Sequence, residues 1–313
     1  MRPGRAPRAL RVPPAVMRVG ARQLGRRCLD PALAWPIQRK RLSQLTRTSL
    51  LPRGTVISRE IIGGVPCDVV SVRSSGSPST VIHFHGGGYC VGSARVVRSW
   101  AAHLSAQADC RVVLPEYRLA PENPYPAALE DARGVFGVLS RDAATCPLVV
   151  SGDSAGGGLA LALVLSTLDE SGDLPAGCIL LSPWLDLGQD RGAVPDLVRR
   201  DVLLTPEWLD ACARAYAEPT SWADRLISPL RADHAKLPPL LIQAGTEELL
   251  APDAESLASS ALAAGVDVTY TRWPGMWHDF ALQPGLLAAA DNAVAQAAWF
   301  LLTRHREARH SGD

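Results

Sequence analysis

From residue 55 onward, short apolar runs alternate with longer segments of helical periodicity. The run STVIHFHGG is typical of a strand, PAALEDARGVFGVLSR of a helix, and CPLVVSGDS again of a strand. Strands that are apolar along their whole length and separated by helices indicate a mostly parallel sheet covered by helices on both faces. Gly63 and Gly64 join the first two strand-like runs, which predicts an antiparallel hairpin at one edge. The chain is therefore predicted to have an α/β fold.

The same pattern suggests how the chain is divided. Residues 55–305 carry the alternation and are predicted to form one α/β domain. Between about 188 and 228 the rhythm breaks, and the chain becomes helical and rich in Trp, Arg and Asp. We expect this insertion to form a helical cap over one end of the sheet. Residues 1–54 are predicted to form a basic helical segment before the domain, as part of the cap, and residues 306–313 a polar tail.

The N-terminal segment differs in charge from the rest of the chain. Residues 1–53 hold thirteen of the 32 Lys and Arg but only one of the 31 acids, Asp30. Helical spacing places apolar residues on one face and arginines on a neighbouring stripe: Met17, Ala21, Leu24 and Cys28, beside Arg18, Arg22 and Arg26. Such a helix can cover an apolar face of its own protein, rest on an anionic membrane or act as a transit peptide. We expect local packing as part of the cap, with peripheral membrane contact as the alternative.

Composition argues against several functional classes. The near-equal numbers of basic and acidic side chains, 32 and 31, do not indicate a nucleic-acid-binding protein. The seven cysteines occur singly, which argues against a disulfide framework or a zinc site and indicates a reducing compartment such as the cytoplasm. No apolar run reaches the roughly 18 residues of a membrane-spanning helix, and the N-terminus lacks the apolar core of a signal peptide.

A serine lies between glycines where a strand passes into a helix, in VVSGDSAGGGLALALVL. Gly152, Ser154 and Gly156 form a G-x-S-x-G pattern, whose small residues let the chain double back and expose the hydroxyl. The helix predicted from Ala155 to about Asp169 places partial positive charge near that hydroxyl. An ordinary tight turn is the alternative. A nucleophile at Ser154 requires a base and an oxyanion site elsewhere in the chain.

A glycine-rich loop, HGGGY, follows the strand at 81–82. In this loop, Gly86, Gly87 and Gly88 let backbone N–H groups approach a substrate, and with the N–H of Ala155 they could hold an oxyanion. We expect the ring of His85 to brace the loop. A phosphate site is the alternative, but neither G-x-G-x-x-G spacing nor a terminal Lys-Ser/Thr is present.

A serine nucleophile needs a base, and the base needs an orienting carboxylate. Of the seven histidines, His278 alone lies in a loop just after a strand near the end of the chain, in WPGMWHDF. The acid should follow the strand at 240–243, where AGTEELLAPD offers Glu247, Glu248 and, further on, Asp253. The order serine, acid, histidine is the one that this fold requires.

Six ordered motifs, HGGGY, YRLAPENPYPAALEDA, GDSAGG, LSPWLDL, SPL and PGMWH, resemble those of the hormone-sensitive-lipase-like esterases of the α/β-hydrolase superfamily. The match runs from about residue 55 to 300. The resemblance implies an α/β-hydrolase fold, a small-molecule ester as partner, and ester hydrolysis through an acyl-serine without metal or cofactor. It also implies a cap built from the N-terminal segment and the region near 188–228.

The resemblance also implies roles for individual residues. Ser154 matches the nucleophile and His278 the base, while Gly87, Gly88 and Ala155 match the oxyanion donors. Asp153, beside the serine, is expected to organise the loop.

The acid is where the chain departs from the family pattern. Most members carry aspartate in a D-P-L-type motif, whereas the matching string here is EELLAPD. Some members place glutamate in strings such as E-x-L-L, and aligning that leucine with Leu250 selects Glu248. Glu247 is the runner-up and Asp253 comes third.

Alternative functions stay open at this point. The same residues could hydrolyse a lactone, a carbamate or an amide. Some plant hormone receptors resemble this family but lack the catalytic histidine, whereas this chain has His278. An apolar site for short- to medium-chain or bulky esters is suggested by five tryptophans, for which ordinary packing is the alternative: Trp184, Trp208, Trp222, Trp273 and Trp277. The sequence indicates no oligomeric state.

Overall fold

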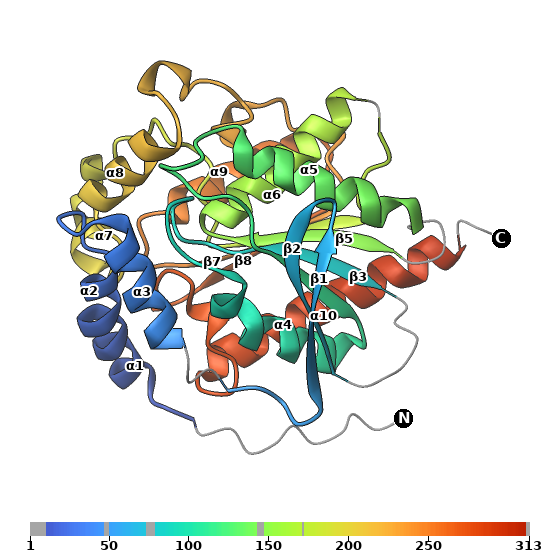
Figure 1. Cartoon of the computed structure of the whole chain (residues 1–313), viewed down its shortest axis with the longest axis horizontal. Coiled ribbons are helices and arrows are strands. Elements are labelled where there is room, and N and C mark those ends of the chain that lie inside the picture. Colours follow the sequence, from blue (N-terminus) through green and yellow to red (C-terminus); the bar gives the residue numbers. More distant parts are fainter. Residues whose placement is uncertain (1–10, 47–49, 73–78, 143–146, 171, 311–313) are drawn as a thin grey trace.

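The computed structural model describes residues 11–46, 50–72, 79–142, 147–170 and 172–310. Its strands are β1 (Thr55–Ile62), β2 (Val65–Val72), β3 (Thr80–Phe84), β4 (Arg111–Pro115), β5 (Leu148–Asp153), β6 (Gly177–Leu181), β7 (Leu240–Gly245) and β8 (Val268–Trp273). They form one sheet in the order β1-β2-β4-β3-β5-β6-β7-β8 (Figure 1). β2 is antiparallel to both β1 and β4, and all other neighbours are parallel. The predicted mostly parallel sheet with an antiparallel edge is confirmed.

The central strands are apolar because both of their faces are covered. Every residue of β3, β5, β6 and β7 is buried, and Val81 of β3 pairs in register with Val112 and Val149 on either side. By contrast, most of edge strand β1 is accessible to solvent. Full burial of the parallel strands leaves their carboxyl ends, where the chain turns into loops, as the place for polar side chains.

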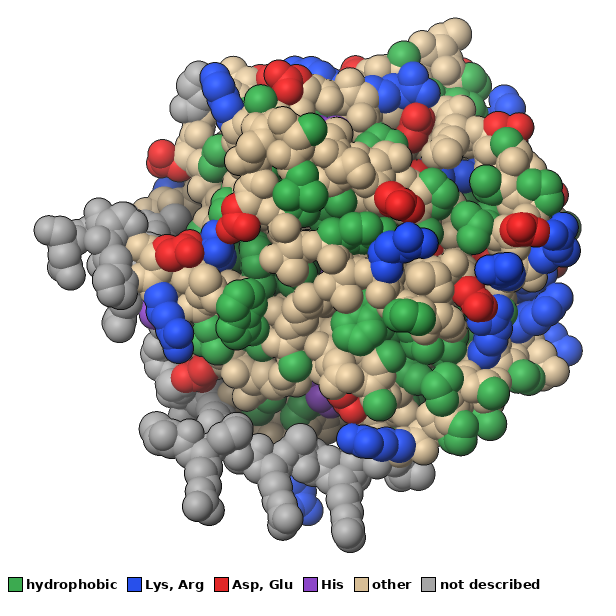
Figure 2. Space-filling model, turned by 180° about the vertical axis from the view of Figure 1, so that it is seen from behind, with side chains coloured by type: hydrophobic (Ala, Val, Ile, Leu, Met, Phe, Trp, Pro, Cys, Tyr) green, Lys and Arg blue, Asp and Glu red, His purple; other side chains and the backbone are tan. Residues whose placement is uncertain are grey.

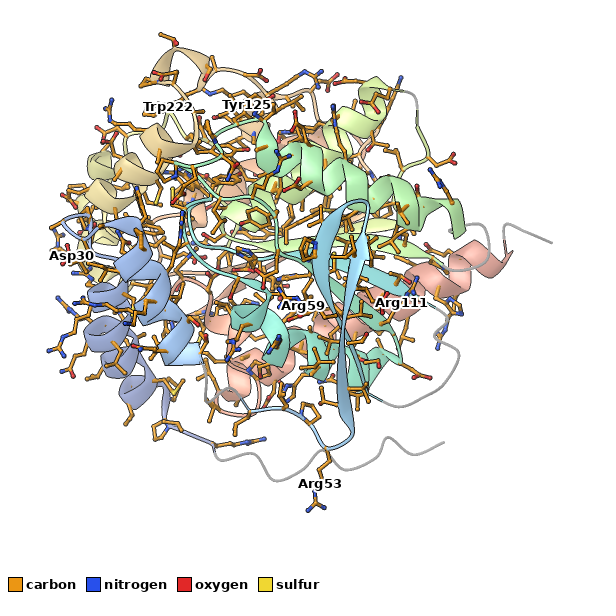
Figure 3. The ribbon with its side chains drawn as sticks, viewed as in Figure 1. Asp30, Arg53, Arg59, Arg111, Tyr125 and Trp222 are labelled. Atoms are coloured by element: carbon orange, nitrogen blue, oxygen red, sulfur yellow. The ribbon has the colours of Figure 1, made fainter. Side chains whose placement is uncertain are left out.

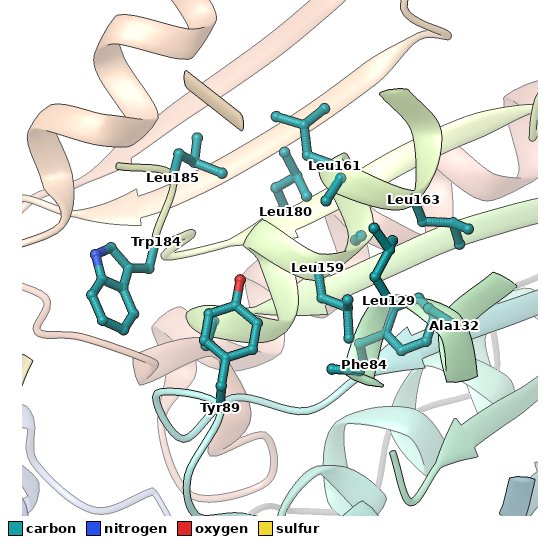
Figure 4. Packing of buried hydrophobic residues seen from close by; sticks show 14 of the residues in the cluster. Phe84, Tyr89, Leu129, Ala132, Leu159, Leu161, Leu163, Leu180, Trp184 and Leu185 are labelled. Atoms are coloured by element: carbon teal, nitrogen blue, oxygen red, sulfur yellow. The ribbon is translucent and has the colours of Figure 1, made fainter. Parts of the chain in front are cut away.

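Helices cover the sheet on both sides. α5 (Ala127–Leu139), α6 (Ala155–Asp169) and α9 (Ala251–Ala263) lie over one face, and α4 (Ala94–Ala108) and α10 (Ala288–His310) over the other (Figure 1). On the first face, Phe84, Leu159 and Trp184 belong to one buried cluster (Figure 4). α10 continues through residues 306–310 of the expected polar tail, and residues 311–313 lie outside the described part of the chain.

Two segments far apart in sequence lie side by side at one end of the sheet (Figure 1). The first holds α1 (Pro14–Gly20), a π-helical turn η1 (Ala21–Gly25), α2 (Arg26–Cys28) and α3 (Trp35–Leu45); the second holds η4 (Arg191–Ala193), α7 (Pro195–Arg200), α8 (Pro206–Tyr216) and η5 (Pro219–Ser221). Arg26 Nη2 donates to the carbonyl of Asp201 at 2.7 Å, and Trp208 Nε1 donates to Gln38 Oε1 at 2.9 Å. The remaining short helices are η3 (Ser140–Asp142), η6 (Pro229–Arg231) and η7 (Phe280–Leu282).

Asp30 and Arg53, two charged residues of the N-terminal region, lie apart from each other in the fold (Figure 3). Asp30 lies in the loop between α2 and α3, whereas Arg53 points away from the body of the protein just before β1. The six cysteines that the structure describes are buried free thiols, and Cys146 falls outside the described residues. Within the described ranges, no helix has the length and apolar character needed to cross a membrane.

Candidate active site

Ser154 lies at the sharp turn between β5 and α6. Its backbone has φ 53° and ψ −122°. Residues other than glycine rarely adopt this backbone conformation, and where they do it is often at a functional site. The turn is possible because Gly152 and Gly156, two residues away on either side, lack side chains: a Cβ on Gly152 would lie 2.1 Å from the carbonyl oxygen of Gly156. The Ser154 N–H donates to the carbonyl of Leu181 on β6, which ties the turn to the next strand. The G-x-S-x-G pattern therefore forms the strained strand-to-helix turn expected of it.

Ser154, His278 and Glu248 form a continuous chain of contacts. Nε2 of His278 lies 3.0 Å from Ser154 Oγ, and its Nδ1 lies 2.9 Å from Glu248 Oε2. The second carboxylate oxygen of Glu248 accepts from the N–H of Gly245 at 2.8 Å, which fixes the carboxylate in place. Glu248 is fully buried, and Ser154 and His278 are only 3% and 2% exposed. Three loops, after β5, β7 and β8, bring these residues together.

The other two candidate acids have different partners. The carboxylate of Glu247 forms an ion pair with Arg18 of α1 and is not among the described contacts of the imidazole. Asp253 is buried in an ion pair with Arg191 at 2.6 Å and also accepts from the N–H of Leu185 at 2.7 Å. The carboxylate that contacts His278 through Nδ1 is therefore that of Glu248.

The glycine-rich loop 85–88 lies against Ser154. Gly87 and Gly88 have φ of 120° and 59°, which favours glycine, and a Cβ on Gly88 would lie 2.5 Å from Sγ of Cys212. Among the described residues, the N–H groups of Gly87, Gly88 and Ala155 have no hydrogen-bond acceptor. No acceptor within the described residues therefore occupies these three N–H groups.

His85 and Asp153 hold the loop and do not contact the Ser154 hydroxyl. Asp153 Oδ2 accepts from the N–H of Gly86 at 2.9 Å, and its Oδ1 lies 2.9 Å from Nε2 of the buried His83. The ring of His85 stacks on Tyr117 with centroids 4.3 Å apart, and its Nδ1 lies 2.8 Å from the carbonyl oxygen of Gly86. Burial lowers the pKa of His85, which favours the neutral form of its ring.

Asp279 also contacts the imidazole, although no motif in the sequence indicates it. Its Oδ2 lies 3.2 Å from Nε2 of His278, on the side that also faces Ser154. Burial lowers the pKa of His278, but the carboxylates of Asp279 and Glu248 outweigh it and raise that pKa well above its usual value. Burial raises the pKa of Asp279 to about 7, against the opposing effect of His278. Its position directly after the histidine was the only signal in the sequence.

Asp201 is a second residue that the sequence did not single out. Its Oδ2 accepts from the N–H of Leu249, and its Oδ1 accepts from the N–H groups of Leu203 and Leu204, each at 2.8 Å. It therefore links the segment that holds α7 and α8 to the residue after Glu248. No motif in the sequence indicates this contact.

A cavity of about 500 Å³ opens onto Ser154 and His278. Its walls are mostly apolar and come from the N-terminal helices, the α7–α8 loop, α8 and the loop after β8, with Met17, Ala21, Leu204, Trp208 and Trp277 among them. Of the other tryptophans, Trp184 and Trp222 line a separate cavity of about 420 Å³, and Trp273 packs on Phe280. Only two of the five tryptophans therefore contribute to this cavity. In the part of the chain that the structure describes, no cluster of side chains could hold a metal ion.

Known proteins resemble this chain over most of its length. The alpha/beta hydrolase fold family matches residues 81–282, which include Ser154, Glu248 and His278. A Mycobacterium tuberculosis protein named as an acetyl-hydrolase, LipR, is 36% identical over 255 residues, covering 81% of this chain and 82% of that protein. An acetyl-hydrolase of Streptomyces hygroscopicus is 36% identical over 256 residues, covering 77% and 84%.

Solved structures show the same similarity. The crystal structure of an esterase from the bacterial hormone-sensitive lipase family superposes with a TM-score of 0.87 at 30% identity, covering 94% of this chain and 99% of that one.

Proposed function

The chain belongs to the α/β-hydrolase family as a carboxylesterase-type hydrolase related to the hormone-sensitive-lipase esterases, and we propose that Ser154, His278 and Glu248 are its catalytic triad. The observation that carries this proposal is the imidazole of His278, whose two nitrogens lie within 3.0 Å of a serine hydroxyl and a buried carboxylate. A serine becomes an effective nucleophile when a base of this kind can take its proton.

In the first half of the reaction, Nε2 of His278 accepts the proton of Ser154 as Oγ attacks the ester carbonyl. The new C–O bond pushes the carbonyl electrons onto oxygen, where the N–H groups of Gly87, Gly88 and Ala155 stabilise the negative charge. Glu248 holds the imidazole in the required tautomer and stabilises the imidazolium. The imidazolium then protonates the leaving alkoxide as the C–O bond to the alcohol breaks, which leaves an acyl-serine.

In the second half, water takes the place of the alcohol. His278 accepts a proton from the water as the water oxygen attacks the acyl carbonyl, and the same N–H groups hold the second oxyanion. Collapse of this intermediate returns the proton to Ser154 Oγ and releases the carboxylic acid. Each proton removed is restored, so the side chains finish as they began.

The cavity supports esters with an apolar acyl or alcohol group as the substrate class. Its largely apolar walls favour short- to medium-chain or bulky groups over charged ones. We propose that the N-terminal helices and the α7–α8 segment form a cap, because both contribute wall residues. A panel of acetyl, butyryl, octanoyl and decanoyl p-nitrophenyl esters, with a lactone and an anilide, tests this preference and separates esterase from lactonase and amidase activity.

We further propose that the cap surface contacts anionic lipid. Exposed apolar side chains lie on the N-terminal helices (Val16, Val19, Leu24 and Ile37), near exposed Arg22 and Arg27. Figure 2 shows basic side chains mixed with hydrophobic ones along the edge that these helices form, on the right of that view. Co-sedimentation with anionic vesicles and not with neutral ones is expected, and equal recovery in both supernatants would refute the contact. The buried free thiols fit the cytoplasm, which we propose as the compartment.

The central proposal is tested with a fluorophosphonate probe and a p-nitrophenyl ester. Wild-type protein should be labelled at Ser154 and hydrolyse the ester, whereas Ser154→Ala should do neither above background. Full esterase activity in the folded Ser154→Ala variant would disprove the triad. Failure of the wild-type protein to react with the probe would favour a receptor over an enzyme.

A further inference from the structure

Asp279 makes an unusual contact with the base of the proposed triad. Its Oδ2 lies 3.2 Å from Nε2 of His278, the same nitrogen that lies 3.0 Å from Ser154 Oγ. The backbone of Asp279 is left-handed, with φ 56° and ψ 25°, and its N–H donates to Ser182 Oγ at 3.3 Å. This conformation turns the side chain that follows His278 back onto the imidazole. The imidazole therefore has a carboxylate at each nitrogen, Glu248 at Nδ1 and Asp279 at Nε2.

The surroundings of this contact are poor in compensating charge. Oδ1 of Asp279 has no hydrogen-bond partner within the described residues, although the side chain is only 17% exposed. Three titratable groups face Asp279. They are His278 in the same loop, Glu248 after β7 and Asp153 at the end of β5. Arg18 of the N-terminal helix is engaged by Glu247. The imidazole is therefore the positive group that Asp279 contacts.

Two carboxylates on one imidazole change what the base can do. A carboxylate that accepts a hydrogen bond from an imidazolium stabilises the charged form. When the ring of His278 is protonated, Nδ1–H can donate to Glu248 and Nε2–H to Asp279, so each of its protons has a partner. Such a ring must first release the Nε2 proton to solvent before it can accept the proton of Ser154. Once that proton is released, the same carboxylate makes the ring a stronger base.

We propose that Asp279 is a further catalytic residue, which competes with Ser154 for the Nε2 proton of His278 and thereby confines hydrolysis to alkaline pH while strengthening the base. This inference rests on the proposed triad and adds a fourth residue to it. Asp279 acts in both acylation and deacylation, because Nε2 carries the proton in each half of the reaction. The direction of the His278 pKa described above agrees with it.

The test is the pH dependence of kcat/KM for p-nitrophenyl butyrate in wild-type protein and Asp279→Asn. Asparagine suits this position because it also tolerates left-handed backbone. Removing an opposite charge in contact shifts a pKa by about 1–3 units. We therefore expect the acid limb of Asp279→Asn to move at least about one pH unit lower. Its alkaline plateau should be below that of the wild type because the base is weaker.

A second variant and a second reaction test whether the shift of the acid limb is due to the carboxylate of Asp279. Asp279→Gly removes the carboxylate and accepts the same backbone, and it should reproduce the shift. The rate of Ser154 labelling by a fluorophosphonate should show the same displaced acid limb, since that reaction uses the same base. As a matched control, Glu247→Gln removes a neighbouring acid that pairs with Arg18, and its acid limb should coincide with that of the wild type.

The proposal is overturned if folded Asp279→Asn and Asp279→Gly keep the wild-type acid limb within about 0.3 pH units, a margin well below the expected shift. It is also overturned if they lose activity equally at every pH, because that pattern indicates a purely structural role. Neither result touches the triad, whose failure is recognised separately by activity in Ser154→Ala.

Discussion

The carboxylate of Glu248 lies 2.9 Å from Nδ1 of His278, while that of its neighbour Glu247 pairs with Arg18. Two identical side chains in one short loop thus serve different parts of the molecule. One lies buried beside the imidazole, and the other links the loop to the N-terminal helix. The backbone N–H of Glu247 donates to the carbonyl of Met276, which keeps the loop close to the segment before His278.

The two glutamates should therefore respond differently to the same substitution. Glu248→Gln replaces the acceptor at Nδ1 with an amide and no longer stabilises the imidazolium, so kcat should fall by about 10³–10⁴-fold. Glu247→Gln should change kcat at alkaline pH by less than about threefold, since surface ion pairs contribute little. Steady-state kinetics with p-nitrophenyl butyrate distinguishes them. An inactive Glu247→Gln beside an unaffected Glu248→Gln would assign the acid to Glu247.

The ion pair of Arg18 and Glu247 should contribute modestly to the attachment of α1. Their side chains are 31% and 24% exposed, so solvent screens the interaction. A double-mutant cycle with Arg18→Gln and Glu247→Gln, measured by urea unfolding, should give a coupling energy of about 0.5–1 kcal/mol. The coupling should shrink in about 1 M salt. A coupling energy of zero at low salt would show that α1 is held by its apolar contacts alone.

Asp153 should matter more for the oxyanion loop than for proton transfer. Asp153→Ala leaves the N–H of Gly86 and the ring of His83 without their acceptor, at a cost of about 1–3 kcal/mol for each buried group. Asp153→Asn keeps one carbonyl oxygen and should be less damaging. We expect lower free energies of unfolding in urea and a lower kcat, in the order wild type, Asn, Ala. Equal kcat in all three proteins would show that the loop holds its shape without this carboxylate.

Gly20 offers a way to test the apolar cavity. It lines the cavity on α1, and a Cβ there would meet no atom within 4 Å, so Gly20→Leu should fill space without a clash. We expect activity on decanoyl esters to fall relative to acetyl esters. Gly137→Leu is the matched control, because Gly137 is a helical glycine of α5 with equally open surroundings that does not line the cavity. Identical chain-length profiles in both variants would place the acyl group elsewhere.

The charges around His278 also predict how stability depends on pH. Folding raises the pKa of Asp279 to about 7 and that of His278 above its usual value, so the folded state binds these protons more tightly than the unfolded chain. Their contribution is present at low pH and is lost as pH rises from about 4 through 7 and beyond. Asp279→Asn removes the part of this pH-dependent loss that is due to Asp279. The free energy of unfolding of the variant should therefore rise relative to that of the wild type between pH 5 and 9. Parallel urea-unfolding stabilities across that range would contradict the expectation.

Local patterns in the sequence were sufficient for the fold and for part of the site. Apolar strands and amphipathic helices leave period-two and period-3.6 patterns, so the sheet, its edge hairpin and the helix from Ala155 to Asp169 could be predicted. Ser154, His278 and the loop at 85–88 could be proposed because glycine spacing and position after a strand reflect the backbone that each site needs. These signals lie within a few residues of the groups they describe.

The family resemblance favoured Glu248 over Glu247, but the contacts that separate the two came only from the tertiary structure, since each side chain meets a different distant segment. The same holds for Asp201, whose contact with Leu249 joins residues 48 positions apart. Asp279 was missed because a left-handed backbone at one position decides whether its carboxylate faces the imidazole or solvent. The sequence by itself determined the sheet, the helices and the nucleophile's turn, because these depend on local propensity and burial. The partners of each charged side chain were decided by the packing of distant loops.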